Sequence, residues 1–503
     1  MTTVDPDLVR LTDQQVIAGA TPVKRVFLEA SPGSGKTTVA AQRFGAQRYT
    51  PSLTTSGRTD DRSVTAVSFT RSATWELHRR VRQTWGPSAL RWPHRIVTLD
   101  TLLYDLFVHL LDTGHVRWPG GHRRLEVHDS WKVLADEKWR FVVVGLRLRG
   151  PDVRVVRTRV LIGASRVSPD DYEAAINAGK CTHEDVREVL GQALASQDAV
   201  DALVARLAAT TRALIVDEVF DANALDIAVL ELAARAGVAI TAIGDPWQAL
   251  YGFRGAKPDA VPGLVARTGM THLPLSQSFR WRSDEQRLLA DALRAGVGVT
   301  LPTDSNSGRG SVDVVLACWW QHLWDVGPHV LPMAYGSAKG NPPEAAATLL
   351  LNHLTRSVFG EDATYLADAL TTLRIADPET PRQLEDALQE VIDTLRTPGK
   401  PALVAAYNQL VATVRTVSPR AFPAARANYT KRLDVLRSRL AYDGQLVPGM
   451  TTHQAKGREW DHVGVRLRDA DAHRLNAGLT YSEEPHRQLY VACTRARIRT
   501  VAV

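Results

Sequence analysis

The sequence has few cysteines and no long apolar run, and each absence excludes a class of protein. Its three cysteines, Cys181, Cys318 and Cys493, lie far apart among 503 residues. That spacing excludes a disulfide framework, a CxxC pair and a four-cysteine iron–sulfur cluster. No apolar stretch approaches the ~20 residues that a membrane span needs. Met1–Arg10 carries acidic residues where a secretory signal would be basic and then apolar. We therefore expect a soluble, cytoplasmic protein with no membrane partner.

The sequence also lacks a strong bias of charge. Lys and Arg total 61 against 54 Asp and Glu, which gives a formal net charge of +7. A surplus this small favours a polyanionic partner such as nucleic acid only weakly. The hydrophobic content of 44% is that of an ordinary folded protein. A chain of this length is expected to form several domains.

Short apolar runs followed by helical patterns predict an α/β fold with parallel strands. Such runs occupy residues 26–30, 64–69, 213–216 and 238–243, and a last strand and helix are expected at 463–465 and 484–494. Glycines or acids follow several of these runs, where open α/β sheets bind their ligands. Gly- and Pro-rich stretches at 296–310 and 336–343 predict linkers.

The segment Ala30–Thr37 reads ASPGSGKT, the spacing of a phosphate-binding P-loop with Ala30 in place of the first glycine. It follows an apolar run and opens a helical pattern, which is the context that such a loop requires. Glycines let backbone N–H groups point at phosphate oxygens, and the helix N-terminus adds partial positive charge. We expect Lys36 to neutralise the β and γ phosphates of ATP and the Thr37 hydroxyl to hold Mg²⁺.

A P-loop needs an acid that holds the metal on a neighbouring strand. The run Leu214–Val216 ends in Asp217 and Glu218. We expect Asp217 to hold Mg²⁺ through water, and Glu218 to orient and deprotonate the attacking water.

Beyond these two motifs, the segment 244–256, GDPWQALYGFRGA, carries a family resemblance. With the P-loop and the Asp-Glu pair, it resembles motif III of the UvrD/Rep/PcrA group of superfamily 1 DNA helicases. Other segments resemble motifs of that group in the same order. They are LTDQQ at 11–15 (Q motif), SFTRSA at 68–73 (Ia), LSQSFR at 275–280 (IV), TTHQAKGREWD at 451–461 (V) and EE…YVACTRA at 483–496 (VI).

The resemblance implies a role for each matching residue. Gln248 would sense the γ-phosphate, and Arg280 and Arg495 would be arginine fingers. Gln15 would read the adenine edge, Phe279 would stack on adenine and Glu459 would lie near the ribose. The implied catalytic residues are Lys36, Thr37, Asp217, Glu218, Gln248, Arg280 and Arg495, with Thr37 and Asp217 at the metal. The implied nucleotide-binding residues are Gln15, Ala30, Ser31, Pro32, Gly33, Ser34, Gly35, Lys36, Thr37, Thr38, Phe279, Gly457 and Glu459.

The same resemblance implies a track for a nucleic-acid strand. Tyr251 and Phe253 would meet bases, and Arg254 would link the track to the nucleotide site. The implied track residues are Phe69, Thr70, Arg71, Tyr251, Phe253, Arg254, Thr452 and His453. The basic stretch 147–159 would clamp duplex phosphates or would be the solvated face of a hairpin, and the sequence leaves both readings open.

Four positions depart from the family's pattern. Asp100 stands where motif Ib usually has His, and Phe220 stands where motif II usually has Gln. Arg71-Ser72 replaces a usual Asn-Lys, and Arg458 replaces a usual Leu. Asp100 would weaken a phosphate contact, and Phe220 would alter the relay between nucleotide and strand. None of them replaces a residue expected to act on ATP.

The expected architecture is two RecA-like P-loop lobes with parallel sheets, each carrying a mainly helical insertion subdomain. The expected first lobe comprises residues 1–103 and 211–285, with an insertion at 104–210. The expected second lobe comprises 286–342 and 445–503, with a short insertion at 343–444.

These features predict an ATP- and Mg²⁺-dependent helicase or translocase on single-stranded DNA and at single-strand/duplex junctions. The resemblance implies 3′-to-5′ movement with duplex unwinding. One alternative is an ATP-sensing subunit of a nuclease or anti-phage defence complex that unwinds little alone, with the nuclease as a protein partner. Another is a P-loop ATPase that binds no nucleic acid.

Overall fold

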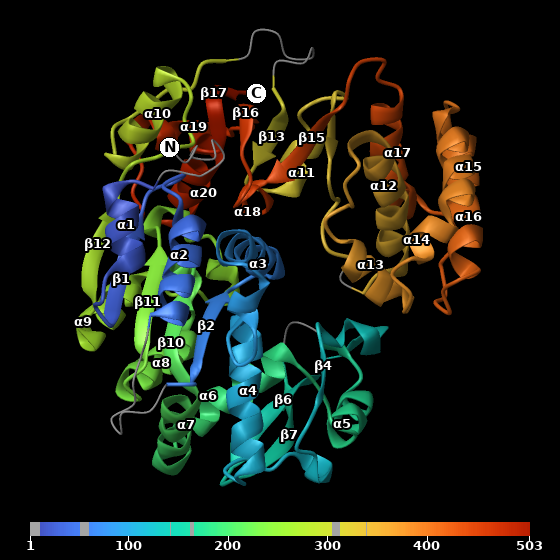
Figure 1. The fold of residues 1–503 in the computed structure, drawn as a ribbon. Helices are drawn as coiled ribbons and strands as arrows, with labels where there is room; N and C mark the ends of the chain where they lie inside the picture. Colours follow the sequence, from blue (N-terminus) through green and yellow to red (C-terminus); the bar gives the residue numbers. More distant parts are fainter. Residues whose placement is uncertain (1–10, 51–59, 141, 161–164, 304–311, 339) are drawn as a thin grey trace.

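The computed structural model describes residues 11–50, 60–140, 142–160, 165–303, 312–338 and 340–503 (Figure 1). Two parallel sheets lie one above the other in this view, and two further groups of elements lie beside them. The acidic stretch Met1–Arg10 and the second half of the expected linker 296–310 lie outside the described residues.

The first sheet has six parallel strands. Their order is β12 (Thr271–Leu275), β1 (Arg25–Ala30), β11 (Ala239–Gly244), β10 (Thr211–Val216), β2 (Ser63–Ser68) and β3 (Arg95–Thr98). The accompanying helices are α1 (Asp13–Ala20), α2 (Lys36–Tyr49), α3 (Arg71–Trp85), α4 (Leu99–Asp112), α8 (Ala224–Arg235) and α9 (Val261–Thr268). Leu28 and Phe27 of β1 belong to different hydrophobic cores. Both faces of the sheet are therefore covered, which is why its strands read as continuous apolar runs. We call this unit the first lobe.

The second sheet has five parallel strands. Their order is β14 (Val330–Pro332), β15 (Val447–Thr451), β13 (Val314–Ala317), β16 (Trp460–Val465) and β17 (Ala496–Ala502). Its helices are α10 (Asp284–Arg294), α11 (Trp320–Trp324), α18 (Thr452–Ala455), α19 (Asp469–Ala477) and α20 (Glu484–Cys493). Strand β17 follows the helix expected at 484–494 and was not predicted from the sequence. This strand mixes arginines with apolar residues at the sheet edge, so it lacks the apolar run of a central strand. We call this unit the second lobe.

A mixed group of helices and strands lies between β3 and β10 in the chain. Its elements are β4 (Glu126–His128), β5 (Ala135–Arg140), β6 (Val142–Arg149), β7 (Asp152–Arg159), β8 (Ser165–Val167), α5 (Pro169–Asn177), β9 (Lys180–Thr182), α6 (His183–Ala193) and α7 (Gln197–Thr210). Strands β6 and β7 form an antiparallel hairpin that contains the basic stretch. Arg157 pairs with Asp170 and Glu173 of α5 at 2.9 and 2.6 Å. These two acids therefore neutralise part of the positive charge with which the hairpin could bind duplex phosphates.

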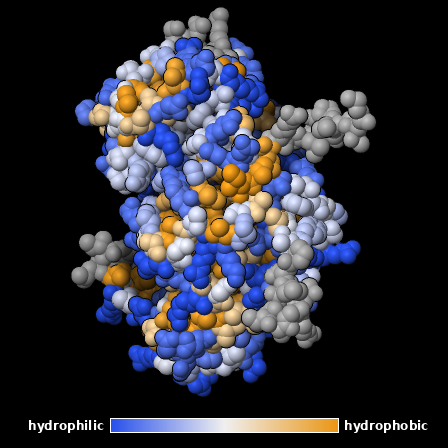
Figure 2. Space-filling model, turned by 60° about the vertical axis from the view of Figure 1, so that its left-hand side comes forward, coloured by the Kyte–Doolittle hydropathy of each residue, from blue (hydrophilic) through white to orange (hydrophobic). Residues whose placement is uncertain are grey.

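An all-helical group lies between β14 and β15 in the chain, and its hydrophobic core also includes Trp324 of α11 and Leu331 of β14. Its helices are α12 (Pro342–Phe359), α13 (Leu366–Leu373), α14 (Thr380–Gln383), α15 (Glu385–Arg396), α16 (Lys400–Arg415) and α17 (Ala427–Leu440). Figure 2 shows one face of the whole molecule as mainly hydrophilic, with hydrophobic residues in separate groups. None of the helices in the described part of the chain is both long and apolar enough to span a bilayer.

Candidate nucleotide and nucleic-acid site

The P-loop connects β1 to α2 and leaves an open cradle at the start of that helix. Gly33 and Gly35 have φ of 72° and 81°, a region that only glycine enters freely. A Cβ on Gly33 would lie 2.6 Å from the Cβ of Arg280, so the loop is packed against the segment that joins the lobes. No side chain caps the first N–H groups of α2, and the buried Ser34 Oγ has no hydrogen-bond partner among the described residues. These unused groups fit a phosphate ligand.

The substitution of Ala30 for glycine is explained by its position. Ala30 is the last residue of β1, pairs with Leu275 of β12 and is fully buried. Its backbone needs no positive φ, so the loop tolerates a Cβ there.

Two adjacent acids follow β10 beside the cradle. Burial, followed by the charge of Glu218, raises the pKa of Asp217 to about 7. Burial alone would also raise the pKa of Glu218, but the ammonium groups of Lys456 and Lys36 bring it below its ordinary value. Glu218 has φ of 61°, which is rare for a residue with a side chain and is found most often at functional sites. Because its pKa lies below the ordinary value, Glu218 stays ionised at neutral pH.

Two guanidinium groups reach the cradle. Arg280 Nε donates to Glu459 at 2.9 Å, and its Nη1 donates to the Thr494 carbonyl at 2.9 Å. Arg495 Nη2 donates to Gln248 Oε1 at 3.0 Å. Burial lowers the pKa of Arg280, and burial together with the nearby Arg280 lowers the pKa of Arg495 to about 9. Such poorly solvated cations favour an anionic ligand.

These groups line one cavity of about 260 Å³ between the lobes. Its lining contains four cations and two carboxylates, a balance that suits a polyanion. The predicted residues in it are Gly33, Gly35, Lys36, Thr37, Thr38, Glu218, Gln248, Phe279, Arg280, Gly457, Glu459 and Arg495. Arg80 of α3 also lines it and donates to Thr38 at 2.7 Å. Sequence reasoning missed Arg80 because it lies outside every motif.

A second, larger cavity of about 470 Å³ adjoins the first, and we call it the track cavity. Thr37 and Glu218 line both cavities, and Asp217 lines the track cavity. The predicted strand-contacting residues that line it are Phe69, Thr70, Tyr251 and His453. A strand in this cavity would therefore lie against the same acids that face the nucleotide cradle.

Lys456 joins the two cavities and was not singled out from the sequence. Its Nζ lies 3.4 Å from Glu218 and 2.5 Å from Asp221, and 5.2 Å from the centre of the Tyr251 ring. Burial alone would lower the pKa of Lys456, but Asp221 and Glu218 raise it above its ordinary value. One second-lobe cation thus contacts the predicted catalytic acid, Glu218, and the predicted track residue Tyr251.

A third contact between the lobes is a buried ion pair. Asp245 is fully buried and accepts from Gln248 at 2.6 Å and from Arg294 of α10 at 3.1 Å. Arg294 also lies 3.7 Å from Glu29 of β1. Gln248 thus lies between Asp245 of its own lobe and Arg495 of the other. The motif residues alone do not reveal Arg294, which lies in an unremarkable helix.

Motif III places an aromatic cluster at the mouth of the track cavity. The Phe253 and His453 rings lie 5.3 Å apart, and the Arg254 guanidinium lies 5.2 Å from the Tyr251 ring centre. Phe253 is 67% exposed. His453 Nε2 donates to the Leu250 carbonyl at 2.9 Å, so the cluster spans both lobes.

Two predicted contacts are corrected by the structure. Thr452 has no exposed surface, and its hydroxyl donates to the Ala317 carbonyl at 3.4 Å, so it holds α18 on the sheet and does not line the track. Gln15 is also buried. Its amide accepts from Thr12 and donates to the Ser34 carbonyl, both at 3.0 Å. Gln15 therefore supports the P-loop, and its side chain is not free to read adenine in this conformation.

The remaining predicted residues lie beside the cavities. Ser31 N donates to the Leu275 carbonyl at 3.0 Å, and the Ser31 carbonyl accepts from Ser34 N at 3.2 Å; these contacts shape the loop around Pro32. Arg71 is exposed and pairs with Asp129 at 2.6 Å.

Two departures from the family's pattern have structural explanations. The Phe220 ring packs 6.0 Å from the Phe27 ring, and Gly244 leaves room for it, so Phe220 is a core residue. Asp100 accepts from Arg187 at 2.7 Å. Its charge is thereby neutralised within the first lobe and its inserted group.

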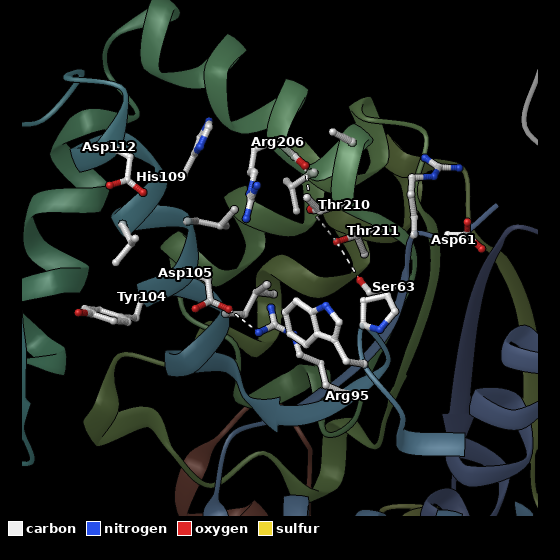
Figure 3. A pocket seen from close by; sticks show the side chains of 18 of the residues that line it. Asp61, Ser63, Arg95, Tyr104, Asp105, His109, Asp112, Arg206, Thr210 and Thr211 are labelled. Carbon is white, nitrogen blue, oxygen red and sulfur yellow. Dashed lines mark hydrogen bonds and ion pairs between the residues drawn. The ribbon is translucent and has the colours of Figure 1, made fainter. Parts of the chain in front are cut away.

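Another cavity, of about 950 Å³, contains none of the predicted site residues. It lies at the amino end of the first-sheet strands, where Ser63 and Thr211 begin β2 and β10 (Figure 3). Arg95 and Asp105 form an ion pair within it. The P-loop lies at the carboxyl end of these strands, so we take the two smaller cavities as the candidate nucleotide and nucleic-acid site.

Parts of the sequence are similar to known helicases. Residues 11–116 and 170–263 match the family model of the UvrD/REP helicase N-terminal domain. The chain is 25% identical to proteins named ATP-dependent DNA helicase UvrD2 from Mycobacterium bovis and Mycobacterium tuberculosis, over 98% of this chain and 78% of each relative. A solved structure of DNA unwinding at forked double-stranded DNA by two coordinating Pif1 helicases aligns at 12% identity. That alignment covers 63% of this chain and 57% of that one, with a TM-score of 0.28.

Proposed function

We propose, from the premise that this chain belongs to the UvrD-like superfamily 1 helicases, that it moves 3′ to 5′ along single-stranded DNA and unwinds duplexes by hydrolysing ATP. One observation carries the proposal. Lys36 of the first lobe, Arg280 of the connecting segment and Arg495 of the second lobe line a single cavity. The site is complete only when the two lobes are together.

We propose the division expected from the sequence, with the first lobe at 1–103 and 211–285 and the second lobe at 286–342 and 445–503. Its boundaries at 103/104 and 285/286 fall inside α4 and α10, which the fold keeps whole in the first and second lobe respectively. The inserted groups are then 104–210 and 343–444. The matched segments of the family model leave residues 117–169 unmatched, within the first of these groups.

In the proposed reaction, Glu218 accepts a proton from the attacking water, because its carboxylate is ionised and faces the cradle. Lys36, Arg280 and Arg495 oppose the charge that develops on the transferred phosphoryl group. Gln248 bonds to Asp245 of its own lobe and to Arg495 of the other, so it would sense the γ-phosphate through Arg495.

Asp217 and the Thr37 hydroxyl are the groups that would hold Mg²⁺. Both line the track cavity beside the cradle. Within the described residues no cluster of three metal-binding side chains exists, which fits an ion held by few protein ligands together with substrate phosphates. When bound, the ion would supply neutralisation of phosphate charge.

Movement requires that closure of the lobes changes the grip on the strand. Lys456 contacts Glu218, Asp221 and the Tyr251 ring. His453 lies three residues before Lys456 in the same second-lobe segment, and its ring packs beside the Tyr251 and Phe253 rings of the aromatic cluster. A shift of this segment would therefore alter the acid and the track together, and a substrate that favours the closed lobes shifts the population toward that grip.

Strand displacement tests the function directly. With ATP and Mg²⁺, the purified chain should displace the labelled strand of a duplex with a 3′ single-stranded tail. It should displace far less from a matched duplex with a 5′ tail. Omission of ATP is the control.

Two outcomes would contradict this proposal. Faster displacement from the 5′-tailed duplex would reverse the direction. Strand-stimulated ATP turnover without displacement from either substrate would instead indicate a subunit that needs a partner such as a nuclease.

A further inference from the structure

We propose that the exposed face of α3 carries the DNA single strand onward from the track cavity, with Trp75 as a stacking platform and the arginines around it as phosphate contacts. This inference rests on the proposed function, because it extends the path of the same strand. Apart from Arg71 of motif Ia, the residues concerned lie outside the helicase-like motifs of the sequence.

Helix α3 leads directly out of the track cavity. Its first turns contribute Ser72, Ala73 and Glu76 to the cavity lining. Trp75 lies on the adjacent side of the helix and is 67% exposed. It belongs to none of the hydrophobic cores of the described residues. In Figure 1 the helix lies centrally, between the first sheet and α18.

Basic residues surround Trp75 on the helix surface. Residues three, four and seven positions apart lie on the same face of a helix. At these spacings from Trp75 stand Arg71, His78, Arg79 and Arg82. The exposed indole therefore lies within a stripe of three arginines and His78, and we call it the α3 stripe. Burial and the nearby Arg82 lower the pKa of His78, so the positive charge of the stripe comes from its arginines.

The cations of this stripe are available to phosphates. Arg71 pairs with Asp129 at 2.6 Å, but both side chains are largely exposed. Arg79 pairs with Glu76 at 2.8 Å, and Glu76 has Arg80 as a second partner. Arg82 is exposed and forms no ion pair within the described residues. Exposed ion pairs contribute little stability, so phosphate oxygens can replace these carboxylates.

The size and composition of the stripe fit a single strand. The eleven helical steps from Arg71 to Arg82 span about 17 Å. At the rise of one strand of a DNA duplex, that length corresponds to at most about five phosphates. Sequence-independent binding of single strands combines backbone cations with aromatic platforms, and the stripe contains both. An acidic peptide would match the charge but would make little use of the exposed indole.

The test compares Trp75→Ala and Arg82→Ala with two matched controls, Trp92→Ala and Arg206→Ala. Trp92 is 84% exposed, and with Arg206 it lines the cavity of about 950 Å³ at the amino end of the first-sheet strands. Arg206 is exposed and labelled in Figure 3. Affinity for a length series of fluorescent oligothymidylates is measured by anisotropy, together with the ATP turnover without DNA and the thermal unfolding midpoint.

For the wild type and both controls, affinity should rise with length over about five nucleotides beyond the shortest oligomer that binds. Trp75→Ala should lose about tenfold in affinity for the longer oligomers and nothing for the shortest. Arg82→Ala should lower the salt dependence of binding by about 0.7 in the log–log slope. The ATP turnover without DNA should be unchanged in all four variants.

Several results would overturn the inference. If the two stripe variants follow the wild-type length series, α3 carries no strand. If they weaken binding of a duplex and not of the single strand, the stripe serves another ligand. Absence of single-strand binding by the wild-type protein would contradict the proposed function itself. Normal single-strand binding by all variants would contradict only the role of the α3 stripe.

Discussion

Arg280→Ala should lower the ATP turnover number at saturating single-stranded DNA by about 10³–10⁵-fold, the range that an arginine finger supplies. Arg280 is almost fully buried in the cradle lined by Lys36. Its removal leaves the charge on the transferring phosphoryl group without a desolvated partner. A lysine at this position keeps a charge but not the planar fork, so Arg280→Lys should recover only part of the rate. Steady-state phosphate release measures both.

Arg282→Ala is the matched control for this prediction. Arg282 lies two residues further along the same segment, is 60% exposed and pairs with Asp461 at 3.6 Å. It does not line the nucleotide cavity. Its substitution should leave turnover near the wild-type value. An Arg280→Ala protein that hydrolyses ATP within tenfold of the wild type would contradict the assignment.

Glu218→Gln should lower the turnover number by about 10²–10⁴-fold, because glutamine cannot accept a proton from water. The two side chains have nearly the same shape, and Lys456 keeps its contact with Asp221. Nucleotide affinity should therefore change little, and the loss should appear in kcat and not in KM. Steady-state kinetics and binding of a fluorescent ATP analogue separate the two quantities.

Glu173→Gln is the control for the acid. Glu173 is an exposed carboxylate of α5 that pairs with Arg157, far from the cradle in the chain. The assignment of Glu218 as the proton acceptor would be wrong if Glu218→Gln kept more than a tenth of the wild-type kcat.

The parts of the fold and site that the sequence predicts are those encoded by contiguous residues. The P-loop couples its glycines, Lys36 and a following helix within eight positions, so its backbone geometry follows from local chemistry. The apolar runs that became β1, β2, β10 and β11 were recognised because strands covered on both faces are apolar throughout. Strand β17 was missed because an edge strand with arginines lacks that pattern.

The parts that the sequence could not predict depend on pairs of residues far apart in the chain. Lys456 meets Asp221, and Arg294 meets Asp245, only after the two lobes have packed. The burial of Thr452 follows from the packing of α18 against β13, which no local pattern encodes. Trp75 would pass for an ordinary core residue in the sequence, and only the fold shows it exposed.

ATP turnover by the wild-type chain and by Lys36→Ala, measured with and without single-stranded DNA, tests the central claim most directly. The account predicts that the strand increases turnover by the wild type, because both ligands contact one closed arrangement of the lobes. It predicts no DNA-stimulated turnover by Lys36→Ala. Stimulated hydrolysis that survives the loss of Lys36, or wild-type turnover indifferent to the strand, would contradict it.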